Sequence, residues 1–442
     1  MTEPEGKLSL KRSMDLGEEA SAYSPLGVPT GKWWAPRPFY VAKAKGSRIW
    51  DIDGNEYLDY WCGAGPLILG HAHPEVVQTA VDAIREGNVQ FALPHEKEVA
   101  LARKLTECIP CAEKVALCVS GTDAIGFAVR AARVYTGKPK AVKFDGGYQG
   151  WSDALGVNYD PSTYGPNPKV VHESAGVLPG AFANTIVLPY NDIEGVATRL
   201  YREKDKVACV VVEPMIHSSN LLPKPGFLEG LRRLCDELSV VLVFDEIVTG
   251  FRHGLSGGQG VVGVIPDMGA FGKAVASGYV IAAVCGRKEL MSHVAPEGTV
   301  KMAGTFSGNA LSSSVALKTL EILSRPGFYP QLFTKGETLR GEINKVIKKM
   351  GLKARCDGFG SVWCLYFSEK QPQNQQDVSV YQKSGGTQKD NAYRQYLLEN
   401  RIFIRPQTVS RAYVSAAHTD EDIRRTIDVT VEFLQKNAAK LK

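Results

Sequence analysis

The sequence predicts an α/β protein with a large, mainly parallel sheet and a smaller α+β domain after it. Between residues 112 and 300, short apolar runs such as VACVVV and VVLVF alternate with helical patterns. Continuous β-branched strands separated by helices are typical of a parallel sheet covered on both faces. After residue 310 the pattern changes to long helices with a few short strands. We therefore expect an arm and hairpin over 1–75, a large domain over 76–310 and a small domain over 311–442.

The first elements follow from local patterns. About 35 polar residues at the amino terminus read as an irregular arm lying on other parts of the protein. SRIWDIDGNEYLDYW, residues 47–61, alternates apolar and polar residues around a DG turn and predicts a hairpin. A His-Pro turn then begins an amphipathic helix that Gly87 closes.

Within the expected large domain, the apolar runs give the strands and one amphipathic stretch gives a helix. The helix covers 227–238, where apolar side chains repeat on one face. The polar insert at 368–391 reads as a surface loop. The strands are expected over 114–119, 140–144, 207–213, 240–246 and 279–286.

Composition excludes several classes of protein. The 442 residues carry a formal charge of +5, but basic and acidic residues are interspersed, so nucleic-acid binding is not expected. Neither a signal-peptide pattern nor a run of membrane-spanning length occurs. The nine cysteines lack disulfide-scaffold spacing, which indicates a cytoplasmic protein. The CIPC pair and the pair His71 and His73 have too few neighbouring ligands for a metal site, so no metal is expected.

Acidic side chains end two of the predicted strands. Asp245 and Glu246 follow the apolar run 240–244, and Glu213 follows VACVVV. In open α/β sheets, ligands bind outside the carboxyl ends of the strands. The sequence therefore places these carboxylates at the ligand-binding edge.

A strand, a tight turn and a helix follow one another in LCVSGTDAIGFAVRAARVYTG, residues 117–137. Ser120, Gly121 and Thr122 would stand at the amino terminus of that helix, where unpaired amides favour a phosphate. A plain helix cap is the alternative for this motif by itself.

Lys273 stands among small apolar residues in DMGAFGKAVASG. Desolvation lowers the pKa of such an amine toward nucleophilic use, although a lysine that reaches water is the commoner case. Its coexistence with Asp245 and the helix start points to pyridoxal phosphate. The phosphate of that cofactor needs a helix terminus, its aldehyde a lysine and its protonated ring nitrogen a carboxylate.

The chain resembles the class III aminotransferases of pyridoxal-phosphate fold type I, and within them the branch like glutamate-1-semialdehyde aminomutase. The resemblance runs from IWDIDGNEYLDY and LGHAHPEV to SAAHTDEDI, through SGTDA, KFDGGYQGW, VVVEP, FDEIVTGFR, PDMGAFGK and GTFSGNALS. It implies a large domain with a mainly parallel sheet, a smaller α+β domain and a small-molecule amino donor and carbonyl acceptor.

The resemblance also implies the cofactor contacts. Lys273 matches the Schiff-base lysine, Asp245 the partner of the ring nitrogen and Ile247 the aliphatic residue on the ring face. The phosphate loop, the stacking aromatic and the threonine that reaches the other subunit's phosphate match Ser120, Gly121, Thr122, Tyr148 and Thr305. The last match implies a homodimer with shared active sites.

Several positions depart from the aminomutase pattern. The YHG motif reads YQG with Gln149, and the asparagine after VEP corresponds to Ser218. An arginine in an SPVR motif has no counterpart near Trp33 and Trp34, and a carboxy-terminal glutamate corresponds to Ser410.

Two arginines and a pair of tryptophans offer substrate contacts instead. Arg405 and Arg411 could each bind a substrate carboxylate, with a surface arginine as the alternative for both. The two tryptophans could wall an aromatic substrate or pack in the core.

The leading hypothesis is a pyridoxal-phosphate-dependent aminotransferase. An aminomutase and an epimerase share every cofactor residue and stay open. A nucleotide-binding oxidoreductase is suggested only by the glycine-rich stretch 254–263, which does not open a strand–turn–helix unit. A binding protein without catalysis is disfavoured by the intact lysine and aspartate.

Overall fold

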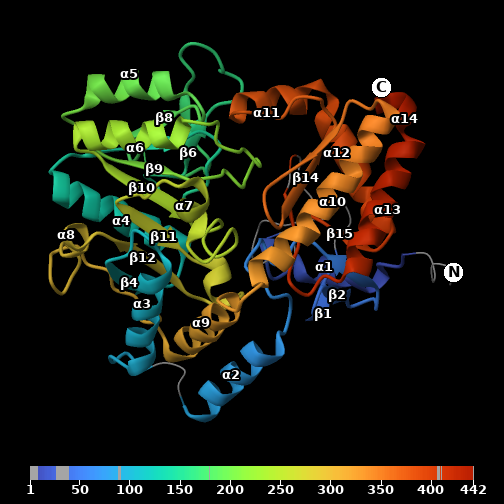
Figure 1. The fold of residues 1–442 in the computed structure, drawn as a ribbon, viewed down its shortest axis with the longest axis horizontal. Helices are drawn as coiled ribbons and strands as arrows, with labels where there is room; N and C mark the ends of the chain where they lie inside the picture. Colours follow the sequence, from blue (N-terminus) through green and yellow to red (C-terminus); the bar gives the residue numbers. More distant parts are fainter. Residues whose placement is uncertain are drawn as a thin grey trace.

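The computed structural model describes residues 8–25, 39–87, 91–178, 180–405, 409 and 411–441, and its centre is a seven-stranded sheet (Figure 1). The strand order is β4-β12-β11-β10-β9-β5-β8. Only β12 runs antiparallel to its neighbours, and the other pairs are parallel. The bounds are β4 Lys114–Cys118, β5 Lys140–Phe144, β8 Thr185–Leu188, β9 Val207–Val212, β10 Val241–Glu246, β11 Met268–Phe271 and β12 Ala282–Gly286. The predicted α/β class is confirmed.

Helices cover both faces of this sheet, as alternation along β10 shows. Val241 and Val243 belong to the apolar cluster under α4, Gly121–Thr136. Leu242 and Phe244 belong to the cluster on the opposite face, under α5 (Ile193–Glu203) and α6 (Phe227–Leu238). Figure 1 shows α4 on one side of the sheet and α5 and α6 on the other. Every β10 side chain is therefore assigned to a face by its position in the strand.

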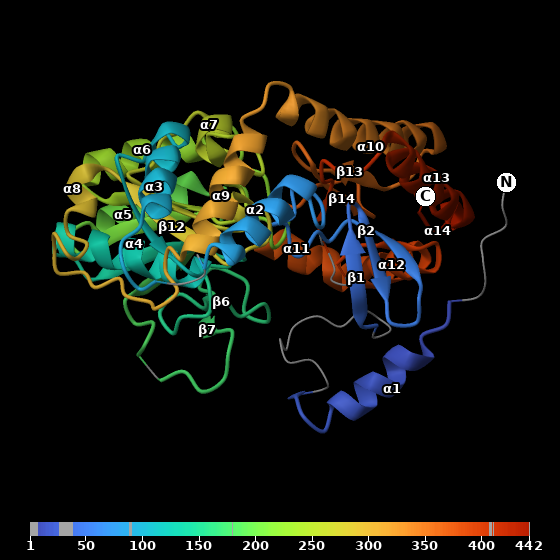
Figure 2. The same cartoon turned by 90° about the horizontal axis from the view of Figure 1, so that it is seen from below.

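The predicted amino-terminal hairpin is present. β1 (Val41–Lys45), β2 (Arg48–Asp51) and β3 (Glu56–Asp59) are antiparallel, and β15 (Ile402–Phe403) adds to β3 in parallel. The hairpin thus joins the carboxy-terminal part of the chain, apart from α4, α5 and α6 (Figure 2). The division at 75 and 310 stays a proposal.

The other helices pack around the large sheet and around the amino-terminal hairpin (Figure 2). α2 covers Pro74–Arg85 and thus ends before Gly87, as predicted. A small sheet has the order β13 (Arg355–Asp357), β14 (Val362–Tyr366) and β16 (Ala412–Tyr413). The remaining elements are α3 Glu96–Cys108, β6 Val157–Tyr159, β7 Val170–His172, α7 Gly257–Val262, α8 Lys288–Met291, α9 Ala310–Leu323, α10 Phe328–Met350, α13 Asp420–Lys436 and α14 Ala438–Leu441.

The expectation of a loop at 368–391 is wrong. That segment forms α11 (Gln375–Tyr381), a π-type turn (Gln382–Gly386) and the start of α12 (Thr387–Glu399). Asn374 caps α11 by accepting the amide of Asp377 at 2.9 Å. The Tyr381 hydroxyl donates to buried Asp390 at 2.8 Å. Val378 and Tyr381 also pack into the apolar cluster of the large sheet, and the polar composition of the segment gave no indication of this long-range packing.

The expectation of an irregular arm is also wrong in part, because Lys11–Ala20 forms helix α1. Asp53, in the turn of the hairpin, accepts the amides of Arg12 and Ser13 at 2.7 and 2.9 Å. A carboxylate at a helix amino terminus pairs amides that the helix itself leaves open. The arm therefore takes its helical start from a residue some 40 positions away.

Two further observations concern the cysteines and the membrane. All nine cysteines are buried free thiols, with Cys108 the last residue of α3 and Cys111 shortly after it. His71 is paired with Asp59 at 2.7 Å. Among the described residues, none of the helices has the length and apolar character needed to span a membrane.

Candidate active site

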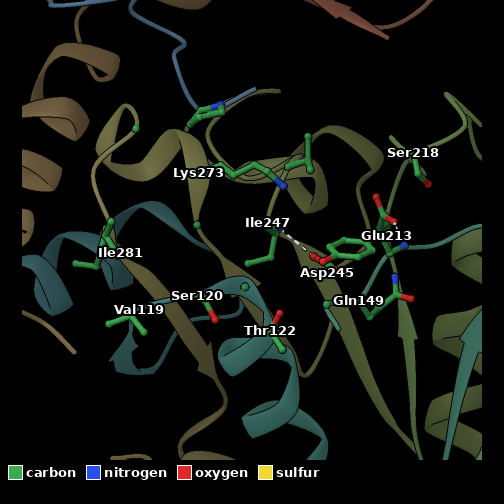
Figure 3. Close-up of a pocket in the computed structure, with 18 of the residues that line it drawn as sticks. Val119, Ser120, Thr122, Gln149, Glu213, Ser218, Asp245, Ile247, Lys273 and Ile281 are labelled. Carbon is green, nitrogen blue, oxygen red and sulfur yellow. Dashed lines mark hydrogen bonds between the residues drawn. The ribbon is translucent and has the colours of Figure 1, made fainter. Parts of the chain in front are cut away.

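A cavity of about 340 Å³ opens at the carboxyl edge of the large sheet. Figure 3 shows the side chains of Lys273, Asp245 and Ile247 directed into the same space, beside Ser120 and Thr122 on the first turn of α4. Parallel strands end at one edge, so the loops that follow them converge there. The predicted residues that line the cavity are Ser120, Gly121, Thr122, Tyr148, Ser218, Asp245, Ile247, Lys273 and Arg411.

Asp245 and Glu246, adjacent in β10, have opposite surroundings. Asp245 has the parity of Val241 and Val243 and faces the cavity on the α4 side. Glu246 faces the other way and accepts the amides of Gly258 and Gln259 at 2.7 and 2.8 Å. The glycine-rich stretch 254–263 therefore surrounds a carboxylate of the protein itself, which argues against a dinucleotide there.

The Asp245 carboxyl is 3% exposed and accepts the Ile247 amide at 3.1 Å. Burial, and then the negative charge of Glu213, raise the pKa of Asp245 to about 8. Glu213 is itself buried and accepts the amides of Tyr148 and His217 at 3.2 and 3.1 Å. A cation placed against Asp245 would offset this repulsion and favour the ionised carboxylate. The site thus favours a positively charged ligand atom.

Lys273 begins a short 3-10 turn, Lys273–Ala276, directly after β11 and Gly272. Its φ of +44° lies in the left-handed region, which is costly for a residue with a Cβ. Such strain persists where the surrounding structure enforces it, often at functional positions. Burial, and then the charge of Arg411, lower the pKa of Lys273 to about 8. An appreciable fraction of this amine is therefore neutral near neutral pH.

The amino terminus of α4 borders the same cavity. The Ser120 hydroxyl accepts the Asp123 amide at 3.2 Å and donates to its carboxylate at 2.8 Å, so this side chain caps the helix. The amides of Gly121 and Thr122, in the first turn, have no acceptor within the helix. The cap and the anion site therefore coexist, because the serine takes one amide and leaves two for a ligand.

Tyr148 and Ser218 stand at the mouth of the cavity. Tyr148 is half-exposed and lines the cavity. The Ser218 hydroxyl donates to the carbonyl of Gly146. Gln149, which the sequence marked only as a departure, is buried in the wall and its Oε1 has no hydrogen-bond partner in the described structure.

Some lining residues gave no local indication in the sequence. Glu213 was placed at the edge by its strand, but Pro66, Tyr279 and Ile281 were not singled out. Val119 directly precedes Ser120, so the strand-to-helix motif could have identified it. Pro66 comes from a loop after β3, and only the tertiary fold brings it to the cavity.

The two candidate arginines lie in different cavities. Arg411 is 6% exposed, lines the cavity and donates to the carbonyl of His217 and the hydroxyl of Tyr413. Arg405 lines a neighbouring cavity that meets the first at Ser218, with its guanidinium 5.3 Å from the ring centroid of Trp61. Of the two, only Arg411 borders the space around Lys273. The surface alternative is therefore wrong for Arg411.

Three further predictions lie elsewhere. Thr305 is exposed in the turn before α9, apart from the cavity of its own chain. Its contact with a second subunit stays a prediction. Trp33, Trp34 and Ser410 lie outside the described residues.

The residues present fit pyridoxal phosphate. Two open helix amides suit a phosphate, the buried Asp245 suits a protonated ring nitrogen, and the Lys273 amine suits an aldehyde. A Cβ on Gly121 would meet the Ile247 side chain at 3.1 Å, so the glycine lets that side chain lie against the helix start. The unpartnered Oε1 of Gln149 offers one more polar contact. Among the described residues, no group of three or more His, Cys, Asp or Glu is placed to hold a metal ion.

Known proteins match this chain over nearly all of its length. The family model described as Aminotransferase class-III matches residues 31–395. A protein of Lachnoclostridium phytofermentans named glutamate-1-semialdehyde 2,1-aminomutase 1 is 38% identical over 432 residues, which is 96% of this chain and 99% of that protein.

Two solved structures show the same fold. An omega-transaminase from Sphaerobacter thermophilus is 31% identical with a TM-score of 0.89, covering 97% of this chain and 98% of its own. A beta-phenylalanine aminotransferase from Variovorax paradoxus is 27% identical with a TM-score of 0.87, covering 98% and 95%.

Proposed function

This chain belongs to the class III aminotransferases and uses pyridoxal phosphate, and from that premise we propose that it transfers an amino group between an amino acid or amine and a carbonyl acceptor. The observation that carries the proposal is the convergence of Lys273, Asp245 and the start of α4 on one cavity. The three groups come from separate segments and meet the separate demands of one cofactor.

The residues would divide the work as follows. When bound, pyridoxal phosphate supplies an aldehyde and a ring that withdraws electrons from the substrate carbon. Asp245 would stabilise a proton on the ring nitrogen, and Ile247 would pack against the ring. The first turn of α4 would bind the phosphate. The Lys273 amine would hold the aldehyde and would serve as the base that removes the proton from the amine-bearing carbon of the donor.

A carboxylate on the substrate would be bound by Arg411. Its guanidinium is buried and lines the same cavity as Lys273, and guanidinium groups bind carboxylates through paired donors. This favours an amino acid over a simple amine as one of the two substrates. The solved relative named for beta-phenylalanine supports a donor whose amine and carboxylate are not on the same carbon.

An aminomutase is the second candidate, because relatives of that name share 38% identity over almost the whole chain. Both reactions need the same proton removal by Lys273 and differ in where the nitrogen ends. An epimerase would return the proton to the same substrate carbon from the opposite face, and the nitrogen would stay on the substrate. Substitution of the aminomutase glutamate by Ser410 disfavours the mutase reaction.

The visible absorption of the purified holoenzyme, followed while amines are added, tests the function. Transamination requires that the cofactor band bleaches with one donor and returns with a keto acid. A band that persists while an amine is isomerised or inverted would favour the mutase or the epimerase. A protein that takes up no pyridoxal phosphate at all would contradict both candidates.

The attachment of pyridoxal phosphate to the apoprotein should accelerate as pH rises through about 8. Only the neutral amine of Lys273 is nucleophilic, and its pKa is about 8. Arg411 contributes to the lowering of this pKa, so Arg411→Met should move the midpoint of the rate profile to higher pH. Stopped-flow absorbance from pH 6 to 10 measures both. An unchanged midpoint in Arg411→Met would contradict the assigned charge coupling.

We expect two copies to associate. Large apolar side chains are exposed at Phe91, Leu93 and Phe306, in two loops that a hydrogen bond from His95 to the Gly308 carbonyl (2.9 Å) holds together. Thr305 is next to Phe306, so a partner covering these loops would meet it. Sedimentation equilibrium should give twice the chain mass, and a monomer would contradict the shared site. The cytoplasmic location stays a prediction, supported by the nine free thiols.

A further inference from the structure

A lysine unrelated to the attachment of the cofactor is buried inside the large sheet. Lys143 lies in β5, between β8 and β9, and is 1% exposed. None of the ion pairs among the described residues includes it. Burying an ammonium group costs several kcal/mol unless its hydrogen bonds are replaced. The sheet must therefore provide acceptors.

The acceptors all come from one loop. The Lys143 ammonium donates to the carbonyls of Gly147, Leu155 and Val157 at 2.9, 3.1 and 2.6 Å. The Asn158 Oδ1 lies 3.4 Å away and accepts the amide of Gly146 at 2.9 Å. The loop 146–158 leaves the carboxyl end of β5 and returns as β6. Lys143 thus ties the outgoing end of the loop to the returning end.

The same loop forms one wall of the cofactor cavity. Tyr148 and Gln149 line that cavity. Gly150, with φ of +87°, packs so closely on α4 that a Cβ there would lie 2.4 Å from the Thr122 hydroxyl. A shift of the loop would therefore displace Tyr148 and, at the same time, push Gly150 against Thr122 at the start of α4.

We infer that Lys143 is a positioning residue, which fixes the ring of Tyr148 and the amide of Gln149 against the cofactor by closing loop 146–158 through its backbone carbonyls. The inference rests on the proposed function, since it assumes that Tyr148 contacts the cofactor. Lys143 itself is not among the residues that line the cavity. Its effect should appear in the geometry and turnover of the bound cofactor more than in the affinity for the substrate.

Lys143→Met, which keeps the length of the side chain and removes the donor, tests this. Displacement of the loop should lower kcat by roughly 10²-fold with KM changed much less. It should also weaken the visible circular dichroism of the bound cofactor. Lys140→Met is the matched control: it lies at the start of the same strand and forms an ion pair with Glu203 at 2.9 Å. It should leave both readouts near the values of the unmodified enzyme.

A double variant shows whether the effect passes through the loop. If Lys143 acts by placing Tyr148, the loss in Lys143→Met should be much smaller when Tyr148 is already alanine. Losses that multiply would overturn the inference, as would unmodified dichroism and kcat in Lys143→Met. If Lys143→Met does not fold, Asn158→Ala replaces it as the test, because loss of the Asn158 side chain releases the same loop at Gly146. Reduced dichroism of the cofactor in Asn158→Ala supports the inference, and unchanged dichroism overturns it. The dichroism is recorded before any amine is added, so it tests Lys143 even if the proposed reaction fails.

Discussion

Lys273→Ala should abolish turnover, with a loss of at least roughly 10⁴-fold in kcat. The variant lacks both the amine that attaches the cofactor and the base that removes the substrate proton. The first turn of α4 and Asp245 remain, so pyridoxal phosphate should still bind, held without a covalent bond. Single-turnover absorbance with an active donor measures the loss, and gel filtration followed by phosphate analysis measures retention of the cofactor.

The control is Lys301→Ala, an exposed lysine before the turn that contains Thr305. It should leave kcat unchanged. A small primary amine added to the Lys273→Ala enzyme should restore part of the rate, because it can carry the same proton. Turnover by Lys273→Ala at a rate near that of the unmodified enzyme would refute the assignment of this lysine.

Asp245→Asn should remove about 3 kcal/mol of transition-state stabilisation. This corresponds to a fall of roughly 10²-fold in kcat/KM. The amide has nearly the shape of the carboxyl but cannot hold a positive charge on the ring nitrogen. The buried carboxyl is also close enough to Glu213 for their charges to interact, so its ionised form depends on that cation. Steady-state kinetics and the visible spectrum of the variant give the two readouts.

Glu246→Gln provides the matched control, since it changes the adjacent carboxyl of the same strand. The Glu246 carboxylate accepts hydrogen bonds from the amides of Gly258 and Gln259 on the other face of the sheet. We expect this variant to unfold at a lower urea concentration while its cofactor spectrum is preserved. Equal kinetic losses in the two variants would mean that the cofactor does not distinguish the faces of β10.

Most of the large sheet could be predicted because short, continuous stretches of sequence specify its strands. Five of its seven strands were predicted from short apolar runs, and the acids that follow β9 and β10 mark the ligand edge. Asp245 and Lys273 could be paired from the sequence since each violates the composition of its surroundings in a way that one cofactor explains. The alternation along β10 then determines which of the two acids faces the cavity, and this could have been predicted from strand parity alone.

What could not be predicted depends on contacts between distant segments. α1 begins on the carboxylate of Asp53, and α11 packs Val378 and Tyr381 into the apolar cluster under α5 and α6, so both read as polar and irregular in isolation. Arg411 appeared equivalent to Arg405 because nothing in their neighbourhoods distinguishes a buried from an exposed arginine. Pro66 enters the cavity only through the path of a loop.

Pro66 and Arg411 come from outside the large sheet, whereas Ser120, Asp245 and Lys273 come from its edge. If Arg411 binds the substrate carboxylate as proposed, the groups that would carry the chemistry and the groups that would choose the substrate lie in different stretches of the chain. Mutations near Pro66 and Arg411 can then change the preferred amine while the catalytic groups stay intact. Members of one family are therefore expected to share the type of reaction more often than the substrate. Efforts to redirect the enzyme to a new amine should therefore randomise the loop around Pro66 and the strand around Arg411 before any residue of the sheet.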